Sequence, residues 1–199
     1  MFWYPVPGHA PVSHIDPPPF VTGHSVFNDM EMDDIIKRAL ALPAEPVRVG
    51  PDLKIRNEEN ISLNRHLLPD QSSSWIYHRI LTTVSVLNAQ SYQYDIKGMD
   101  EPLYFVTYEG SRKGHYNWHY DGTTAGHAPR KLSITFQLSP SDAYTGGDLE
   151  FNRTGNPTRA PRDRGTFVMF PSYILHRVTP VTKGTRHAIV AWINGPPFR

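Results

Sequence analysis

Two segments of the chain place apolar residues at helical spacing. The first, NDMEMDDIIKRALAL at residues 28–42, is followed by Pro43 and carries acidic side chains in its first turns. The second runs from about residue 74 to residue 90, with the serines at 72–74 as N-cap candidates. The two apolar stripes are Met32, Ile35, Ile36, Ala39 and Leu40, and Ile76, Ile80, Val84 and Leu87. Both patterns are typical of amphipathic helices that pack against a core.

From Tyr92 onward the pattern changes to short runs rich in β-branched and aromatic residues, separated by turns that contain glycine. The runs are YQYDI, LYFVTYE, HYNWHYD, KLSITFQLS, DLEF, GTFVMF, HRVTPV and TRHAIVAWI. About eight short strands in roughly 100 residues favour an antiparallel sandwich or barrel. We therefore expect an α+β, mainly β fold in which the two helices pack on one sheet of a β-barrel.

The length of 199 residues suits a single domain, 1–199, which is large enough to bury a proper core. Within it we expect an extended Pro-rich leader at 1–24, helical support at 25–91 and the β-barrel catalytic core at 92–195. Six prolines in the first 20 residues exclude a regular helix or a central strand from that part of the leader.

Composition excludes several classes of chemistry. The chain has no cysteine, so a metal site would rest on His, Asp, Glu and water. Lys and Arg number 20 against 19 Asp and Glu, without a sustained basic run, which counts against a nucleic-acid partner. The N-terminus lacks a basic region typical of signal peptides, and no apolar run approaches the roughly 20 residues of a membrane span. We expect a cytoplasmic protein without a membrane partner.

The segment HYNWHYDGT at 115–123 offers two alternative pairs of metal ligands. In a helix, His115 and His119 would lie about 6 Å apart on one face. In a strand, His119 and Asp121 share a face about 7 Å apart, whereas His115, on that same face, lies about 13 Å from His119. Gly114 and Gly122 bracket the segment, and its Tyr and Trp residues favour a pleated surface. The sequence therefore predicts a strand with His119 and Asp121 as the pair, and His115 has no assigned role.

A third ligand must come from elsewhere, and His176 in FPSYILHRVTPV is the best candidate. Two imidazoles and one carboxylate with open positions suit non-haem Fe(II) better than closed structural zinc. Strand alternation places Arg186 and Trp192 on one face and His187 on the other, which predicts a surface position for His187. If the guanidinium of Arg186 faces an apolar barrel interior, it needs a carboxylate as its partner. The alternative is that Arg186 is a solvent-exposed arginine of a hairpin.

These residues resemble the signature of Fe(II)/2-oxoglutarate-dependent oxygenases, particularly the prolyl-4-hydroxylase-like branch called PKHD-type hydroxylases. The supporting motifs are Tyr108 with Gly110, RKLS at 130–133, QLS at 137–139, YTGGDLEF at 144–151, FPS at 170–172 and LHRVTPVTKGTR at 175–186. They keep the family's order and approximate spacing between Tyr92 and Trp192. The resemblance implies a double-stranded β-helix, a jelly-roll or cupin-like barrel, with helices packed against one side.

The resemblance also implies roles for individual residues. His119, Asp121 and His176 would bind Fe(II), and Arg186 would bind the far carboxylate of 2-oxoglutarate. Many enzymes of the branch have Lys where this chain has Arg186. Both residues bind a carboxylate, so the difference changes the geometry of binding and not the class of enzyme. The softer assignments are Tyr108 as a wall of the cosubstrate pocket, Thr135 and Gln137 as contacts of the far carboxylate, Val178 as packing on the cosubstrate and Trp192 as an aromatic beside the iron. O2 would be the second cosubstrate, with ascorbate as a candidate reductant.

The activity that this resemblance implies is hydroxylation of an unactivated C–H bond, with succinate and CO2 as co-products. The expected substrate is a peptidyl side chain, as in prolyl 4-hydroxylases. One alternative is the same chemistry on a small molecule such as a free amino acid or a nucleobase. A third hypothesis is a metal-binding barrel without turnover. Either a monomer or a homodimer fits the sequence.

Overall fold

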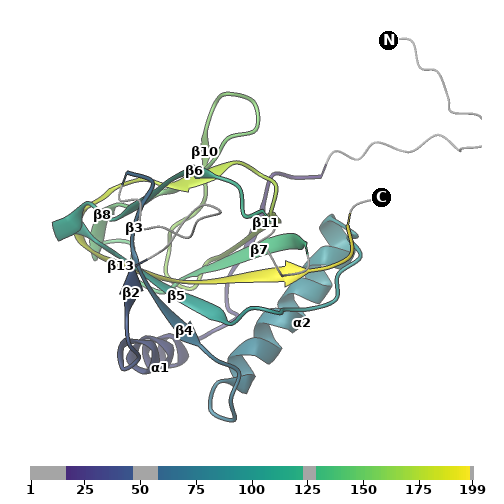
Figure 1. The fold of residues 1–199 in the computed structure, drawn as a ribbon, viewed down its shortest axis with the longest axis horizontal. Helices are drawn as coiled ribbons and strands as arrows, with labels where there is room; N and C mark the ends of the chain where they lie inside the picture. The colour runs from purple at the N-terminus through teal and green to yellow at the C-terminus, as the bar shows by residue number, and fades with distance from the viewer. Residues whose placement is uncertain (1–16, 47–57, 123–128, 198–199) are drawn as a thin grey trace, which may run out of the picture.

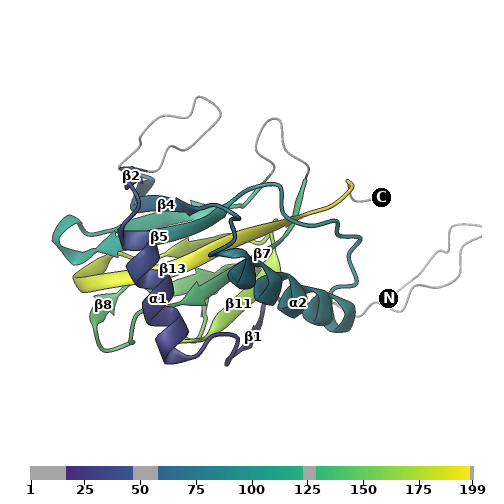
Figure 2. The same ribbon diagram turned by 90° about the horizontal axis from the view of Figure 1, so that it is seen from below.

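The computed structural model describes residues 17–46, 58–122 and 129–197. Two antiparallel sheets lie face to face, and two helices cover the outer face of the larger sheet (Figures 1 and 2). The arrangement is a double-stranded β-helix of mainly β structure, which confirms the expected fold class. Residues 1–16, most of the expected leader, lie outside the described residues.

The larger sheet has the strand order β1-β11-β7-β13-β5-β4-β2, and β8 pairs with β13 outside this path. Its strands are β1 (Val21–Gly23), β2 (Glu45–Pro46), β4 (Leu63–Leu67), β5 (Leu103–Glu109), β7 (Arg130–Gln137), β8 (Tyr144–Gly146), β11 (Phe167–Pro171) and β13 (Val181–Asn194). The long strand β13 is central and pairs with both β5 and β7. Its inward side chains therefore have neighbours on two strands.

The smaller sheet has the order β10-β9-β12-β6-β3. Its strands are β3 (Asn60–Ile61), β6 (His115–His119), β9 (Leu149–Phe151), β10 (Thr158–Arg159) and β12 (His176–Val178). A short 3-10 helix, η1 (Gly110–Arg112), joins β5 to β6. In the central pair of this sheet, His176 on β12 lies opposite His119 on β6.

The helices are α1 (Asp29–Leu40) and α2 (Ser74–Ser91), close to the expected spans. At the start of α1, Asn28 and Glu31 form a reciprocal capping box, which satisfies two backbone donors that the first turn leaves free. The buried stripes of both helices join one apolar cluster with outward residues of the larger sheet, such as Phe105, Phe136 and Ile189. That cluster fixes the sheet from outside and leaves its inner face for the site.

A second apolar cluster lies between the two sheets and includes Val106, Tyr108, Phe151, Phe170 and Val178. Along β13, Ile189, Ala191 and Ile193 belong to the helix-side cluster, while Val190 packs against the inner one. Alternate side chains of β13 therefore lie on opposite faces of the larger sheet, as the sequence predicts.

His187 on β13 points away from the barrel interior as expected, but it is half-buried rather than fully exposed. Its ring stacks on Phe105 at 5.0 Å between centroids, and its Nδ1 lies 3.1 Å from Thr107 Oγ1. These contacts leave the side chain only partly exposed to solvent. Burial accordingly lowers the pKa of His187 to about 4.

The run YQYDI at 92–96 is not a strand. Tyr92 is the C-cap of α2, and Gln93 has a φ of 53°, in the left-handed region. The side chain of Asn88 accepts a hydrogen bond from the Tyr94 backbone N–H and donates one to the Tyr94 carbonyl. Because the backbone N–H and carbonyl of Tyr94 already bond to Asn88 of α2, they are not available to pair with a neighbouring strand.

Strands also occur before residue 92, where an extended leader followed by helices was expected. β1 lies in the leader and pairs with β11 at the edge of the larger sheet. Just before it, Phe20 packs on Phe151 of β9 at 4.7 Å, and Arg153 donates a 3.0 Å hydrogen bond to the Pro17 carbonyl. The described end of the leader therefore binds both sheets of the barrel.

Candidate metal centre

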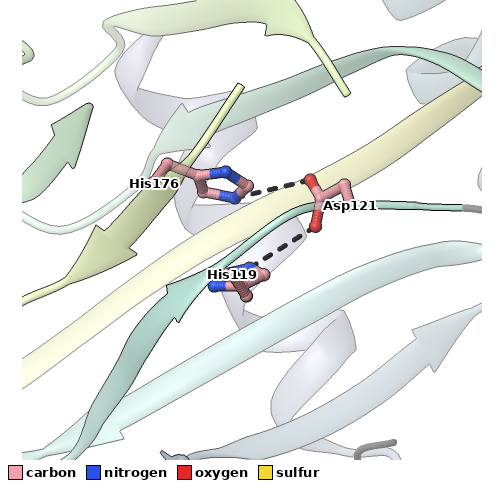
Figure 3. A group of neighbouring side chains, drawn as sticks. All are labelled: His119, Asp121 and His176. Carbon is pink, nitrogen blue, oxygen red and sulfur yellow. Dashed lines mark ion pairs between the residues drawn. The ribbon is translucent and has the colours of Figure 1, made fainter. Parts of the chain in front are cut away.

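The two strands at the centre of the smaller sheet bring three ligand-type side chains together (Figure 3). His119 is the last residue of β6, and His176 is the first residue of its partner β12. Asp121 lies two residues beyond β6, where its backbone N–H donates to the Ser172 carbonyl at 2.9 Å. That bond holds the chain beside the turn before β12, so the carboxylate faces both imidazoles.

The three side chains converge on one point between them. Asp121 Oδ1 lies 3.5 Å from His119 Nε2, and Asp121 Oδ2 lies 3.5 Å from His176 Nε2. One ligand atom from each residue lies within 4.8 Å of the other two. Such spacing suits a single ion held at about 2 Å from each atom.

Backbone carbonyls determine which imidazole nitrogen can bind a metal. His119 Nδ1 lies 2.7 Å from the Asn117 carbonyl, and His176 Nδ1 lies 2.8 Å from the Ile174 carbonyl. A carbonyl only accepts, so each Nδ1 carries the proton and each Nε2 presents a lone pair in the neutral ring. Two lone pairs thus face a carboxylate, and a cation between them satisfies all three groups.

The charges of the buried groups agree with this arrangement. Burial lowers the pKa of His176 to about 4, despite the opposing effect of the Asp121 charge. Burial alone would raise the pKa of Asp121, but interaction with His176 and His119 outweighs it and holds that pKa far below its usual range. At neutral pH the site therefore offers a neutral imidazole at His176 beside an ionised carboxylate. Two imidazoles and one carboxylate are the donor set expected of a non-haem Fe(II) site with open positions.

Tyr116 is a contact of the site that the sequence did not indicate. The ladder between β6 and β12 pairs His119 with His176 but Tyr116 with Val178, so β6 holds one extra residue in a bulge. The bulge reverses the alternation and stacks Tyr116 on the His119 ring, with centroids 3.4 Å apart. The expectation that His115 shares the face of His119 is therefore wrong, and His115 contacts the Lys113 carbonyl instead.

Arg186 lies deeper in the barrel on β13 and is 2% exposed. Its Nη2 and Nε donate to Gln137 Oε1 at 2.8 Å and 3.2 Å, and its Cζ lies 5.3 Å from the Tyr108 ring centroid. Among the described residues no carboxylate pairs with this guanidinium, so the alternative of a solvated hairpin arginine is wrong. A buried guanidinium held by a neutral amide keeps its full charge, which favours an anion as its ligand.

The remaining candidates also point into the barrel or lie in its walls. Thr135 is buried on β7 opposite Val190, and Val178 belongs to the inner apolar cluster. Trp192 contacts Tyr104 edge-on at 4.8 Å, and its Nε1 is buried without a hydrogen-bond partner among the described residues. The structure thus groups Arg186 with Gln137 and Tyr108, and leaves the ligand contacts of Thr135, Val178 and Trp192 as predictions.

The sequence of the barrel matches a known family. Residues 103–194, which contain all nine candidate residues, match the model of the 2OG-Fe(II) oxygenase superfamily. The matched segment spans a little less than half of the chain. A PKHD-type hydroxylase of Synechococcus sp. is 42% identical over 80 residues, which cover 40% of this chain and 36% of that protein. The PKHD-type hydroxylase YbiX of Escherichia coli is 40% identical over 84 residues, with 40% and 37% covered. The matches thus span less than half of these relatives' own length.

Solved structures of oxygenases share the fold at low sequence identity. A prolyl hydroxylase from Trichoplax adhaerens, in complex with a hypoxia inducible factor peptide fragment, has a TM-score of 0.75 and 16% identity. The alignment covers 89% of this chain and 84% of that chain. A Pseudomonas putida prolyl-4-hydroxylase has a TM-score of 0.70 and 15% identity, with 90% and 94% covered. Both likenesses support the double-stranded β-helix over nearly the whole chain.

The barrel also has a buried ion pair near Trp192. Arg130 forms bidentate contacts with Glu101, and its Cζ lies 3.7 Å from the Trp192 ring centroid. Arg130 begins β7 and is held from two sides. Within the described part of the chain, no helix is long and apolar enough to span a membrane.

Proposed function

We propose that the chain is an Fe(II)- and 2-oxoglutarate-dependent dioxygenase that hydroxylates an unactivated C–H bond. The observation that carries this proposal is the convergence of two tautomer-fixed imidazoles and one carboxylate within 4.8 Å, deep in an oxygenase-superfamily barrel. The buried guanidinium of Arg186 supports it further, because a dicarboxylic cosubstrate supplies the anion that no described residue provides. Succinate and CO2 are the expected co-products.

In this proposal His119, Asp121 and His176 hold Fe(II). The bound iron would supply the redox chemistry by which O2 oxidises both 2-oxoglutarate and the substrate C–H bond. The residues themselves bind, orient and exclude water. Arg186 fixes the far carboxylate, and Tyr116 restricts His119 to one ring orientation by stacking on it. The apolar cluster around Val178 and Phe170 removes water from the interior, which strengthens every charge interaction there.

For the substrate we propose a peptidyl side chain, with proline as the first candidate. The support is the PKHD-type hydroxylase names of the relatives and the likeness to prolyl hydroxylases, one of them solved with a peptide. A small-molecule substrate is the second candidate. Ascorbate is the proposed reductant for iron that becomes oxidised, and the protein acts as a monomer or a homodimer.

The test begins with protein purified without oxygen and loaded with Fe(II). Succinate is measured after aeration with 2-oxoglutarate, alone and with a panel of Pro-containing peptides, and peptides are examined for a 16 Da mass gain. We expect peptide-dependent succinate formation in the intact protein and none in His119→Ala. Succinate that rises with a free amino acid but with no peptide favours the small-molecule substrate. Folded, iron-loaded protein that forms no succinate under any of these conditions contradicts the enzyme and favours a binding barrel.

A further inference from the structure

The described end of the leader lies at the same end of the barrel as the metal centre. β1 runs antiparallel to β11, with Val21 opposite Met169, so the chain before Val21 runs toward Pro171 and the turn after it. In that turn the Ser172 carbonyl accepts the hydrogen bond that holds Asp121. The leader therefore joins the barrel beside the turn that positions a metal ligand.

Two ring contacts connect the leader to the metal ligand His176. Phe20 packs on Phe151 at 4.7 Å between centroids, and the Phe151 ring lies 6.0 Å from the His176 ring. Arg153, two residues beyond Phe151, donates a 3.0 Å hydrogen bond to the Pro17 carbonyl. The end of the leader is thus held against the smaller sheet, close to the metal centre.

Three tyrosines form a strip beside the strand that carries the leader. Tyr173 follows Ser172, is 49% exposed, and its hydroxyl lies 3.0 Å from that of Tyr94. Tyr94 stacks on Tyr92 at 5.6 Å, and the Tyr92 hydroxyl donates to the carbonyl of Met169, the residue opposite the first residue of β1. Aromatic surfaces bind proline-rich segments, because a polyproline chain is already extended and needs little ordering. We call these three residues the tyrosine strip.

The leader is rich in the residue that the proposed enzyme would hydroxylate. Residues 1–16, MFWYPVPGHAPVSHID, contain Pro5, Pro7 and Pro11. An extended or polyproline chain advances about 3 Å per residue, so Pro11 can lie up to about 20 Å from Pro17, and Pro5 up to about 40 Å. Only two ring contacts separate the described leader from a metal ligand, so this length is sufficient for each of the three prolines to reach the metal centre.

We propose that the leader docks on the tyrosine strip and is a substrate of its own barrel, which hydroxylates at least one of Pro5, Pro7 and Pro11. This inference rests on the proposed function and names its substrate as a proline-rich segment of the same chain. In the reaction, one atom of O2 enters a ring C–H bond of proline, and the other enters succinate as 2-oxoglutarate loses CO2. The tether gives the leader an effective concentration of about millimolar, which favours it over a dilute peptide of equal affinity.

The main test follows the mass of the leader in the full chain. Protein loaded with Fe(II) without oxygen is given 2-oxoglutarate, aerated with no added peptide, and digested for tandem mass spectrometry. We expect a gain of one oxygen atom on a proline of residues 1–16, with a first-order rate constant that is unchanged by about tenfold dilution. A rate constant that falls about tenfold overturns the intramolecular assignment and identifies a second copy of the chain as the enzyme.

Tyr173→Ala tests the docking surface. It is expected to slow the modification of the leader by about 3- to 10-fold, the range for losing one aromatic contact. Leu40→Ala is the matched control, since Leu40 on α1 is 46% exposed and lies outside the tyrosine strip, and the rate should not change. The same rate in Tyr173→Ala as in the unmodified protein overturns docking on the strip.

Substitution of the leader prolines separates the leader from added substrates. The triple variant Pro5→Ala, Pro7→Ala, Pro11→Ala is expected to lose the modification and to keep its turnover of added Pro-containing peptides. Pro43→Ala, at an exposed position after α1, is the control and is expected to lose neither. Oxygen that still enters residues 1–16 of the triple variant at the original rate overturns the assignment to these prolines.

Docking can also be measured without turnover. Under anaerobic conditions, Mn²⁺ in place of Fe(II) broadens the NMR signals of nearby amides, and Zn²⁺ serves as the diamagnetic control. We expect broadening by Mn²⁺ at Gly8, which lies between Pro7 and Pro11, and none at Lys37 on α1. Equal Gly8 signals with the two metals overturn docking of the leader near the metal centre.

The outcomes distinguish this inference from the proposed function. If added Pro-containing peptides are hydroxylated while the leader never gains oxygen, the inference is wrong and the proposed function stands. If the leader is hydroxylated, both are supported. If neither the leader nor any peptide gains oxygen, and folded, iron-loaded protein forms no succinate, the proposed function fails and this inference fails with it.

Discussion

Gly147 tests how closely the side chains around Arg186 are packed, because a single methyl group can be added there. Its φ is +68°, and a Cβ at this position would lie 2.8 Å from Val181 Cγ2, 3.1 Å from Arg186 Cδ and 3.2 Å from Tyr144 Cε2. All three contacts are buried side chains of the inner wall. The substitution Gly147→Ala therefore combines backbone strain with overpacking against the stem of Arg186.

The expected magnitude has two parts. A left-handed backbone costs an L-residue about 1–2 kcal/mol, and an extra methyl group in a packed core costs about 1–3 kcal/mol. Gly147→Ala is thus expected to lower the free energy of unfolding by about 2–5 kcal/mol. At about 2–4 °C for each kcal/mol in a chain of this length, the melting temperature should fall clearly. Displacement of Arg186 should also raise the 2-oxoglutarate concentration needed for half-maximal turnover several-fold.

Gly155 is the matched control, since its φ is +92° and a Cβ there meets nothing within 4 Å. Gly155→Ala carries the strain without the overpacking, so we expect a loss of about 1–2 kcal/mol and an unchanged 2-oxoglutarate requirement. Urea unfolding of both variants gives the free energies, and succinate formation gives the requirement. Equal losses of stability in the two variants, with no change in the 2-oxoglutarate requirement of Gly147→Ala, would refute the packing argument.

Three other substitutions test separate features. His119→Ala should abolish stoichiometric iron binding, measured by metal analysis after desalting, whereas His115→Ala should retain it; equal loss in both would favour the helical pair. Because burial lowers the pKa of His187 to about 4, the unfolded chain takes up its proton first as pH falls below about 6.5, and stability is lost between pH 6.5 and 4. His187→Gln should remove up to about 3 kcal/mol of that loss in urea unfolding, and an identical pH profile would contradict it. Glu101→Gln removes the ion-pair partner of Arg130 and should lower the free energy of unfolding by about 3–5 kcal/mol. A loss below about 1 kcal/mol would contradict the importance of this ion pair.

The separation of the two faces of the central strands could be predicted from the sequence. Helical spacing located α1 and α2, and alternation of period two assigned Arg186 and His187 to opposite sides of β13. These patterns depend only on the spacing of residues along one helix or strand. They can therefore be recognised without knowing which elements lie beside it. The same reasoning selected His119 and Asp121 over His115.

Short and irregular elements could not be predicted in this way. β1, β2 and β3 have two or three residues each, too few for a period to appear. The bulge in β6 adds one residue against β12, which reverses the alternation and brings Tyr116 rather than His115 beside His119. An extra residue of this kind is a property of two paired strands, and neither strand shows it alone.

By itself the sequence determined the ligand types and the faces of the strands that carry them. Only the tertiary structure decided that His176 lies opposite His119 and that Gln137 meets Arg186. It also decided that the Arg186 guanidinium is buried with no carboxylate beside it among residues 17–46, 58–122 and 129–197. The physical reason is that local periodicity fixes the direction of a side chain, whereas its partner depends on strand order and register. Those are set by the packing of the whole barrel.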